Sequence, residues 1–344
     1  MKAIIYLTLG FVLSGCNDPL TINEVSHENE SEWLIDTNYL RNGCFSGKDC
    51  IPSLQSPSKS GINGTNLEFL DDDDLVVGVW NGSEFVAYPH PILDWHEIIN
   101  ETSYSISYCP LTGSAIHMKT TGEYGVSGLL YNSNLIMYDR NTGSYWPQMF
   151  LKSAAGIRQG DDTVLKTMIE TTWKNWKNLF PYSKVINSKT GHSRNYRRFP
   201  YNQYKTCNSE NCGDYIYFPV STVDKRLPAK ERVLSIIFHN SQKAYQISKY
   251  RQPIIFNETM EGISLAVVVS GIDNIAVAFK TSENLKIDVW DLEAGNLVLS
   301  NDLGDKWNIM GRSITGNNHL IPAPAYISYW FAQAAFYPGT KIQQ

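Results

Sequence analysis

The stretch LVVGVWNGSEFVAYP, residues 75–89, contains two apolar runs separated by one short polar turn. The turn carries Asn81-Gly82, the dipeptide that two-residue hairpin turns favour, and valine and aromatic residues on both sides are typical of paired strands. This segment predicts an antiparallel β-hairpin. The following residues 90–100 (HPILDWHEIIN) change to a helical period, and residues 171–181 (TTWKNWKNLFP) predict a second short helix that ends at a proline.

The pattern of residues 76–93 recurs in VLSIIFHNSQKAYQISKY, residues 233–250. Later landmarks return in the same order: the tripeptide Asn-Glu-Thr at 100–102 and 257–259, and a Trp-to-Pro segment in each half. Ordered landmarks of this kind indicate an internal duplication, although two copies are too few for a solenoid. The predicted fold class is α+β and β-rich, with two related lobes, each of antiparallel strands and one or two short helices.

The domain organisation follows from this comparison. We expect five segments: an export signal at 1–15, a lipidated cysteine with a tether and an irregular lead-in at 16–60, a first lobe at 61–195, a connecting loop at 196–222, and a second lobe at 223–344.

The N-terminus reads MKAIIYLTLGFVLSGC. Its apolar run is shorter than the roughly 20 residues that span a bilayer, and suits the h-region of an export signal. Leu13-Ser14-Gly15-Cys16 resembles a bacterial lipobox, so we expect lipid on Cys16, with an ordinary signal peptide as the alternative. The predicted location is the bacterial cell envelope, and Asn17 favours the outer membrane, facing the periplasm or the cell surface.

Composition excludes several classes of protein. The chain has a net charge of −5 with no basic stripe, which argues against nucleic acid as a partner. Neither a GxGxxG loop, a Walker loop nor an HExxH motif occurs. The predicted partners are the membrane, through the lipid anchor, and an unknown small molecule or envelope protein. The cofactor is unknown.

Six cysteines are present, and Cys16 is assigned to lipid. Two pairs lie in short polar loops and predict local disulfides, with crossed pairing between the loops as the alternative. The cysteines of these pairs are Cys44 with Cys50 and Cys207 with Cys212. No CxxC motif supports a zinc site. Cys109 remains without a partner.

We expect the candidate site in the first lobe, because the second lobe lacks the corresponding thiol and imidazole side chains. Cys109 aligns with Ser270, His117 with Ala278 and His96 with Pro253. A thiol becomes reactive when a nearby imidazole lowers its pKa, so Cys109, His96 and His117 are the candidate catalytic residues. The alternative is that Cys109 is a small buried residue.

Four further residues are candidate binding residues: Ser114, Ser127, Asp139 and Trp146. Asp139 recurs as Asp291, which favours acceptance of backbone N–H bonds in a turn. Copper is a third possibility, with His96, Cys109, His117 and Met118 as ligands. Adjacent strand residues face opposite ways, so only one of His117 and Met118 could take part.

Several motifs resemble the bacterial and archaeal family catalogued as domain of unknown function 3179: KDCIP, AYPHPILDWHEIIN, SYCPLTGSA, YGVSGLLYNSNLIMYDRNTGSYWPQ and TTWKNW…FP. The resemblance covers most of residues 45–344 and implies a fold and a site region, but no reaction. Cys50 stands where the family usually has glycine, which makes the Cys44–Cys50 pair a local elaboration.

The main functional hypothesis is a lipoprotein that binds a ligand or partner in a cleft of the first lobe. The alternative is a thiol-dependent enzyme or redox protein that uses Cys109, and the third hypothesis is a protein that handles copper.

Overall fold

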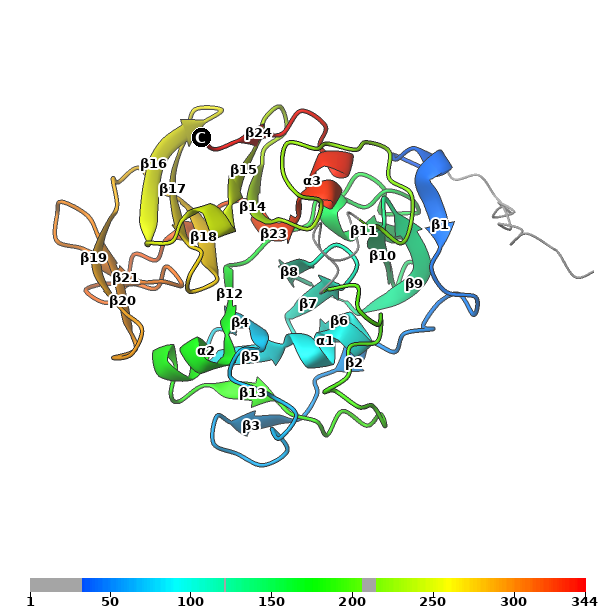
Figure 1. Cartoon of the computed structure of the whole chain (residues 1–344), viewed down its shortest axis with the longest axis horizontal. Coiled ribbons are helices and arrows are strands. Elements are labelled where there is room, and N and C mark those ends of the chain that lie inside the picture. The colour runs from blue at the N-terminus through cyan, green and yellow to red at the C-terminus, as the bar shows by residue number, and fades with distance from the viewer. Residues whose placement is uncertain (1–32, 121, 206–214) are drawn as a thin grey trace, which may run out of the picture. The chain divides into compact units, whose positions relative to one another are not determined.

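The computed structural model describes residues 33–120, 122–205 and 215–344. These residues form five β-sheets and three short α-helices, so the expectation of a β-rich fold with short helices is confirmed (Figure 1). Neighbouring strands pair antiparallel except at β2–β6, β5–β13 and β15–β24. Cys16, Cys207 and Cys212 lie outside the described residues.

The predicted hairpin is present and is the centre of a five-stranded sheet. Its strands, in order across the sheet, are β12 (Met168–Thr172), β4 (Leu75–Trp80), β5 (Phe85–Pro89), β13 (Lys184–Ile186) and β3 (Lys59–Gly61). Helix α2 (Trp173–Leu179) follows β12, and the Thr172 side chain caps it by accepting a hydrogen bond from the Asn175 N–H.

The largest sheet has eight strands and includes strands from both halves of the chain. In order they are β2 (Leu54–Gln55), β6 (Ile98–Asn100), β7 (Tyr104–Cys109), β8 (Ser114–Lys119), β23 (Ala325–Tyr329), β14 (Arg232–Ile237), β15 (Gln242–Gln246) and β24 (Lys341–Ile342). The halves meet where Ala115 of β8 pairs with Ile327 of β23. The two halves therefore share one sheet.

Three smaller sheets complete the β-structure. One contains β1 (Leu40–Asn42), β9 (Tyr124–Tyr131), β10 (Asn134–Asp139) and β11 (Tyr145–Pro147). The other two contain β16 (Ile254–Met260), β17 (Ile263–Ser270), β18 (Ile275–Lys280) and β22 (Ile321–Pro322), and β19 (Lys286–Asp291), β20 (Asn296–Ser300) and β21 (Lys306–Asn308). The remaining helices are α1 (His90–His96), α3 (Trp330–Phe336) and the 3-10 turns η1 (Thr37–Tyr39), η2 (Gln148–Phe150) and η3 (Ile247–Lys249).

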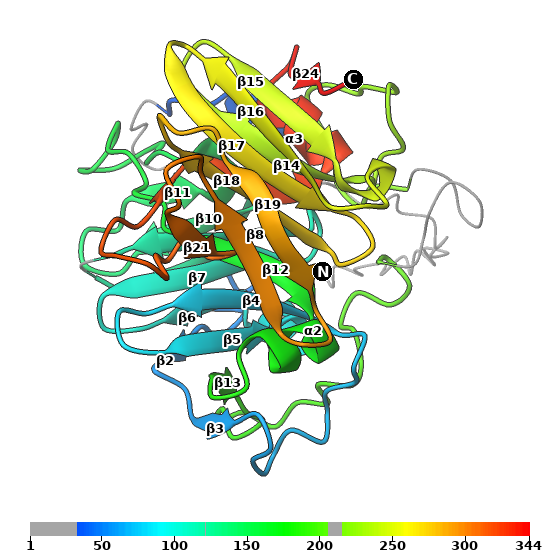
Figure 2. The same cartoon turned by 90° about the vertical axis from the view of Figure 1, so that its left-hand side faces the viewer.

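The strand pairing of the first half recurs in the second. The order β12-β4-β5-β13 corresponds to β23-β14-β15-β24, and the last pair is parallel in both. Helix α3 follows β23 as α2 follows β12. Figure 2 shows β14 to β18 above the first-half strands β4 to β7.

Residues that the two halves share make the same structural contacts. The Tyr88 hydroxyl donates to Glu101, and the Tyr245 hydroxyl donates to Glu258. The side-chain amide of Asn257 donates to the Leu285 carbonyl and accepts from the Leu285 N–H. In the first half, the side-chain amide of Asn100 makes the same two hydrogen bonds with the backbone of Tyr124. These contacts agree with a role in the fold for the repeated residues.

Two expectations about local structure were wrong. The helix predicted over residues 90–100 ends at His96, because Glu97 has a positive φ of 55° and the chain then enters β6. The lead-in over 16–60 is not irregular throughout, since η1, β1, β2 and most of β3 fall within its described part. Strands this short depend on the sheet edge that they join, which local sequence does not reveal. Among the described helices none has the length and hydropathy needed to cross a membrane.

Candidate functional site

Cys109 lies at the end of β7 and is only 1% exposed. Its Sγ accepts a hydrogen bond from the Leu135 N–H at 3.4 Å, and lies 3.8 Å from the Ser133 carbonyl oxygen, to which it donates. Burial raises the pKa of this thiol to about 11. Near neutral pH the side chain is therefore a protonated, packed thiol.

His117 lies on the opposite face of the sheet from Cys109. In the β7–β8 ladder Cys109 is paired with Ser114 and His117 with Ile106, and side chains alternate between faces along each strand. His117 Nδ1 is 2.8 Å from the Thr167 carbonyl oxygen, and burial lowers the imidazole pKa to about 3. It is thus a neutral ring that does not face the thiol.

His96 also binds groups other than the thiol. Its Nδ1 lies 2.8 Å from the Pro52 carbonyl oxygen and its Nε2 lies 2.8 Å from the Tyr196 hydroxyl. Burial lowers its pKa to about 4. The structure does not bring the three candidate catalytic residues together, and within the described ranges no three His, Cys, Asp or Glu side chains form a group that could hold a metal ion.

Ser114 belongs to a buried polar network that joins β8 to β10 and η2. Its hydroxyl donates to Gln148 Oε1 at 2.6 Å and lies 2.8 Å from the Thr112 hydroxyl. The Asn134 amide donates to Gln148 Oε1 at 2.9 Å. Because these groups satisfy one another, the network fixes the packing of the strands.

The other candidate binding residues have structural contacts as well. Ser127 donates to the Ile136 carbonyl at 2.6 Å, across the β9–β10 pair. Asp139 accepts the Asn141 N–H at 2.8 Å in the following turn, which agrees with the turn role expected for it. Trp146 is buried, and the Arg158 guanidinium stacks 4.9 Å from its ring centre.

A cavity of about 290 Å³ lies beside strands β9 and β10. Its walls are formed by strands β9 and β10, the loop around the Cys44–Cys50 disulfide, and segments near residues 200 and 217. The lining residues are Gly43, Cys44, Cys50, Ile51, Glu97, Leu111, Val126, Gly128, Leu129, Leu130, Leu135, Pro200, Tyr201, Asn202, Tyr217 and Phe218. Most of them are apolar or aromatic, as in sites for small molecules.

Glu97 is the one carboxylic acid among the lining residues, and it is only 5% exposed. Its Oε1 accepts a hydrogen bond from the Tyr201 hydroxyl at 2.9 Å. Within the described residues, Oε2 has no donor. Burial raises the pKa of this carboxyl to about 7, and the charge of Asp94 adds to the effect. The cavity therefore contains an acid that changes its charge near neutral pH.

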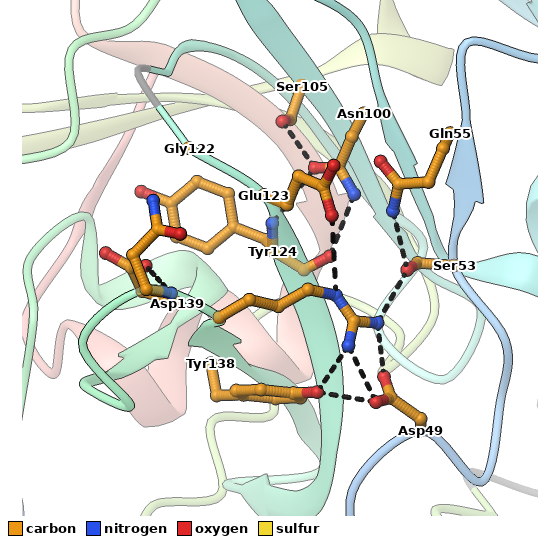
Figure 3. A network of polar contacts seen from close by, with 12 residues as sticks. Asp49, Ser53, Gln55, Asn100, Ser105, Gly122, Glu123, Tyr124, Tyr138 and Asp139 are labelled. Carbon is orange, nitrogen blue, oxygen red and sulfur yellow. Dashed lines mark hydrogen bonds and ion pairs between the residues drawn. The ribbon is translucent and has the colours of Figure 1, made fainter.

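One wall of the cavity is held by covalent and ionic contacts. The predicted Cys44–Cys50 disulfide is present, so local pairing is confirmed for this pair. Asp49, inside that loop, accepts two hydrogen bonds from Arg140 at 2.6 and 2.8 Å and one from the Tyr138 hydroxyl (Figure 3). Burial opposes the ionisation of Asp49, but these hydrogen bonds lower its pKa. The loop is thereby fixed to β10.

Sequence reasoning missed Glu97 and Tyr201. Glu97 follows His96 in an apolar segment, and a charged residue between buried ones was a usable signal. Tyr201 carries no such signal, because it comes from the connecting loop and only folding brings it to Glu97. None of the four candidate binding residues lines the cavity.

The comparisons with known proteins identify a family. A model of the family described as "Protein of unknown function (DUF3179)" matches residues 48–340. No curated protein and no solved structure matches the chain.

Proposed function

The chain belongs to the DUF3179 family, and on that premise we propose that it is a lipid-anchored protein of the bacterial cell envelope that binds a small, mostly apolar ligand. The cavity of about 290 Å³, lined by residues of β9, β10, the Cys44–Cys50 loop and the segments near residues 200 and 217, carries this proposal. An engineered cavity of about 150 Å³ holds benzene, so this one has room for roughly a dozen non-hydrogen atoms.

The chemistry of the lining supports binding rather than catalysis by the thiol. Leucine, valine and aromatic side chains supply apolar contacts, and Glu97 supplies a polar group that can orient a ligand. A thiol-dependent reaction at Cys109 would need a base to form the thiolate, and neither His96 nor His117 hydrogen bonds to the sulfur. Ligand binding in the cavity requires no base beside the Cys109 sulfur.

We also propose that the two halves derive from one duplicated unit, forming lobes at 61–195 and 223–344. The recurring strand order and the equivalent contacts of Tyr88 and Tyr245 support this. In the same proposal the site belongs to the first lobe, whose strands β9 and β10 form one wall of the cavity together with residues 43–51 and 200–218.

Ligand binding is tested by filling the cavity. Ile51 is partly buried and lines the cavity, whereas Ile272 is exposed and does not. Calorimetry with 2-phenylethanol or 2-phenylethylammonium should detect binding to the wild-type protein. The affinity of Ile51→Trp for the probe should be at least tenfold lower, and the affinity of Ile272→Trp should equal that of the wild type. Failure of the wild-type protein to bind either probe, or equal binding by both variants, would contradict the proposal.

Anchoring is tested independently of ligand binding. The variant Cys16→Ser should be unlipidated and should leave the membrane fraction. If this variant stays in the membrane fraction with its mass unchanged, the lipoprotein assignment is wrong. The lipid anchor places the protein in the envelope, where the Cys44–Cys50 disulfide would persist.

A further inference from the structure

The cavity combines one carboxyl group with three aromatic side chains: Tyr201, Tyr217 and Phe218. We infer that its ligand is an organic ammonium ion with a small apolar body, whose positive nitrogen binds Glu97 and the aromatic rings. This inference rests on the proposed ligand-binding function and names the chemical class of the ligand.

The carboxyl group of Glu97 lacks a positive partner. Among the described residues no lysine, arginine or histidine forms an ion pair with it. Lys205 binds Asp94, whose charge acts on Glu97, at 2.6 and 2.7 Å from its two oxygens. A buried carboxylate is costly unless a positive charge compensates it, so an ammonium ion would supply the missing charge.

The aromatic rings suit the same kind of ligand. Tyr217 and Phe218 line the cavity together with Tyr201, which also bonds to Glu97. Ammonium ions bind to the faces of aromatic rings through the ring quadrupole, and the attraction grows when water is excluded. A carboxylate in a cavity lined by aromatic residues therefore favours a cation over an anion or a neutral molecule.

A neutral ligand is the competing possibility. If Glu97 were protonated in the complex, it would donate a hydrogen bond to a carbonyl or hydroxyl oxygen of the ligand. The two possibilities differ in pH dependence, since an ammonium ion binds the ionised acid and a neutral acceptor binds the protonated acid. The other titratable groups that interact with Glu97 are Tyr201, Cys109 and Asp94, which is itself paired with Lys205.

The experiment compares 2-phenylethylammonium with 2-phenylethanol, which has nearly the same shape but no charge. Calorimetry on the full-length protein should give at least tenfold tighter binding of the ammonium ion at pH 8. Its affinity should rise roughly tenfold from pH 6 to pH 8, because the ionised fraction of a group with a pKa of about 7 rises by that factor. The alcohol should bind equally or more weakly as the pH rises.

The variant Glu97→Gln should lose at least tenfold in affinity for the ammonium ion, lose the pH dependence, and keep its affinity for the alcohol within threefold. The control Glu123→Gln changes an exposed acid outside the cavity and should behave as the wild type. If Glu97→Gln does not fold, Tyr201→Phe serves instead: it removes a hydrogen bond that lowers the pKa of Glu97, so the rise in ammonium affinity should move to higher pH.

Tighter binding of the alcohol, affinity for the ammonium ion that falls with pH, or full ammonium binding by Glu97→Gln would overturn the inference. In each of these cases the cavity still binds a ligand, so the proposed function survives. Absence of binding by both probes would remove the proposed function as well.

Discussion

Replacing Glu97 by glutamine should make the stability of the protein depend less on pH between pH 5 and pH 8. The pKa of Glu97 is raised from 4.5 to about 7 in the folded protein. The native state therefore binds a proton more tightly than the unfolded chain does, and the resulting stability is present below pH 4.5 and is lost as the pH rises through 7. Because the side chain is almost fully buried, solvent screening reduces this effect little.

The size of the effect follows from the two pKa values. A tenfold difference in proton affinity between the folded and unfolded states corresponds to about 1.4 kcal/mol, so linkage gives a loss of roughly 2–3 kcal/mol in the free energy of unfolding between pH 5 and pH 8. Glutamine cannot ionise and should not show this loss. His96 and His117 have lowered pKa values, but they are present in both proteins and their contributions cancel in the comparison.

Urea unfolding at pH 5, 6, 7 and 8 measures the difference directly. The free energy of unfolding of the wild type should fall by roughly 2–3 kcal/mol more than that of Glu97→Gln over this range. The variant Tyr201→Phe should show a larger loss than the wild type, because it removes the hydrogen bond that lowers the pKa of Glu97. Parallel pH profiles for the wild type and Glu97→Gln would refute the reasoning.

Three further outcomes are expected. Gly78→Ala should cost about 2–3 kcal/mol, seen as a lower Tm, because its Cβ would lie 1.8 Å from a ring carbon of Trp176; an unchanged Tm would contradict this packing. The native Cys109 thiol should resist maleimide at pH 7 and react after unfolding, since its pKa is about 11, and rapid labelling of the folded protein would show a different environment. Reduction of the Cys44–Cys50 disulfide should cost about 2 kcal/mol, and an equal urea midpoint before and after reduction would argue against this.

Local sequence was sufficient for the elements whose partners are close in the chain. The hairpin at 75–89 is decided by its Asn-Gly turn and its valine-rich strands, and the Cys44–Cys50 bridge closes within one loop. The alternation of residues along β8 was enough to predict that His117 and Met118 face opposite ways. In each case the interaction spans only a few residues.

Tertiary structure decided the composition of the cavity. Cys109 and His117 lie on neighbouring strands, yet the register of β7 and β8 puts them on opposite faces. Glu97 and Tyr201 lie far apart in sequence, and the partnership of their side chains depends on where the connecting loop packs. Burial, not residue type, moves the pKa of Glu97 towards neutrality and that of Cys109 away from it, and burial exists only after distant segments have packed together.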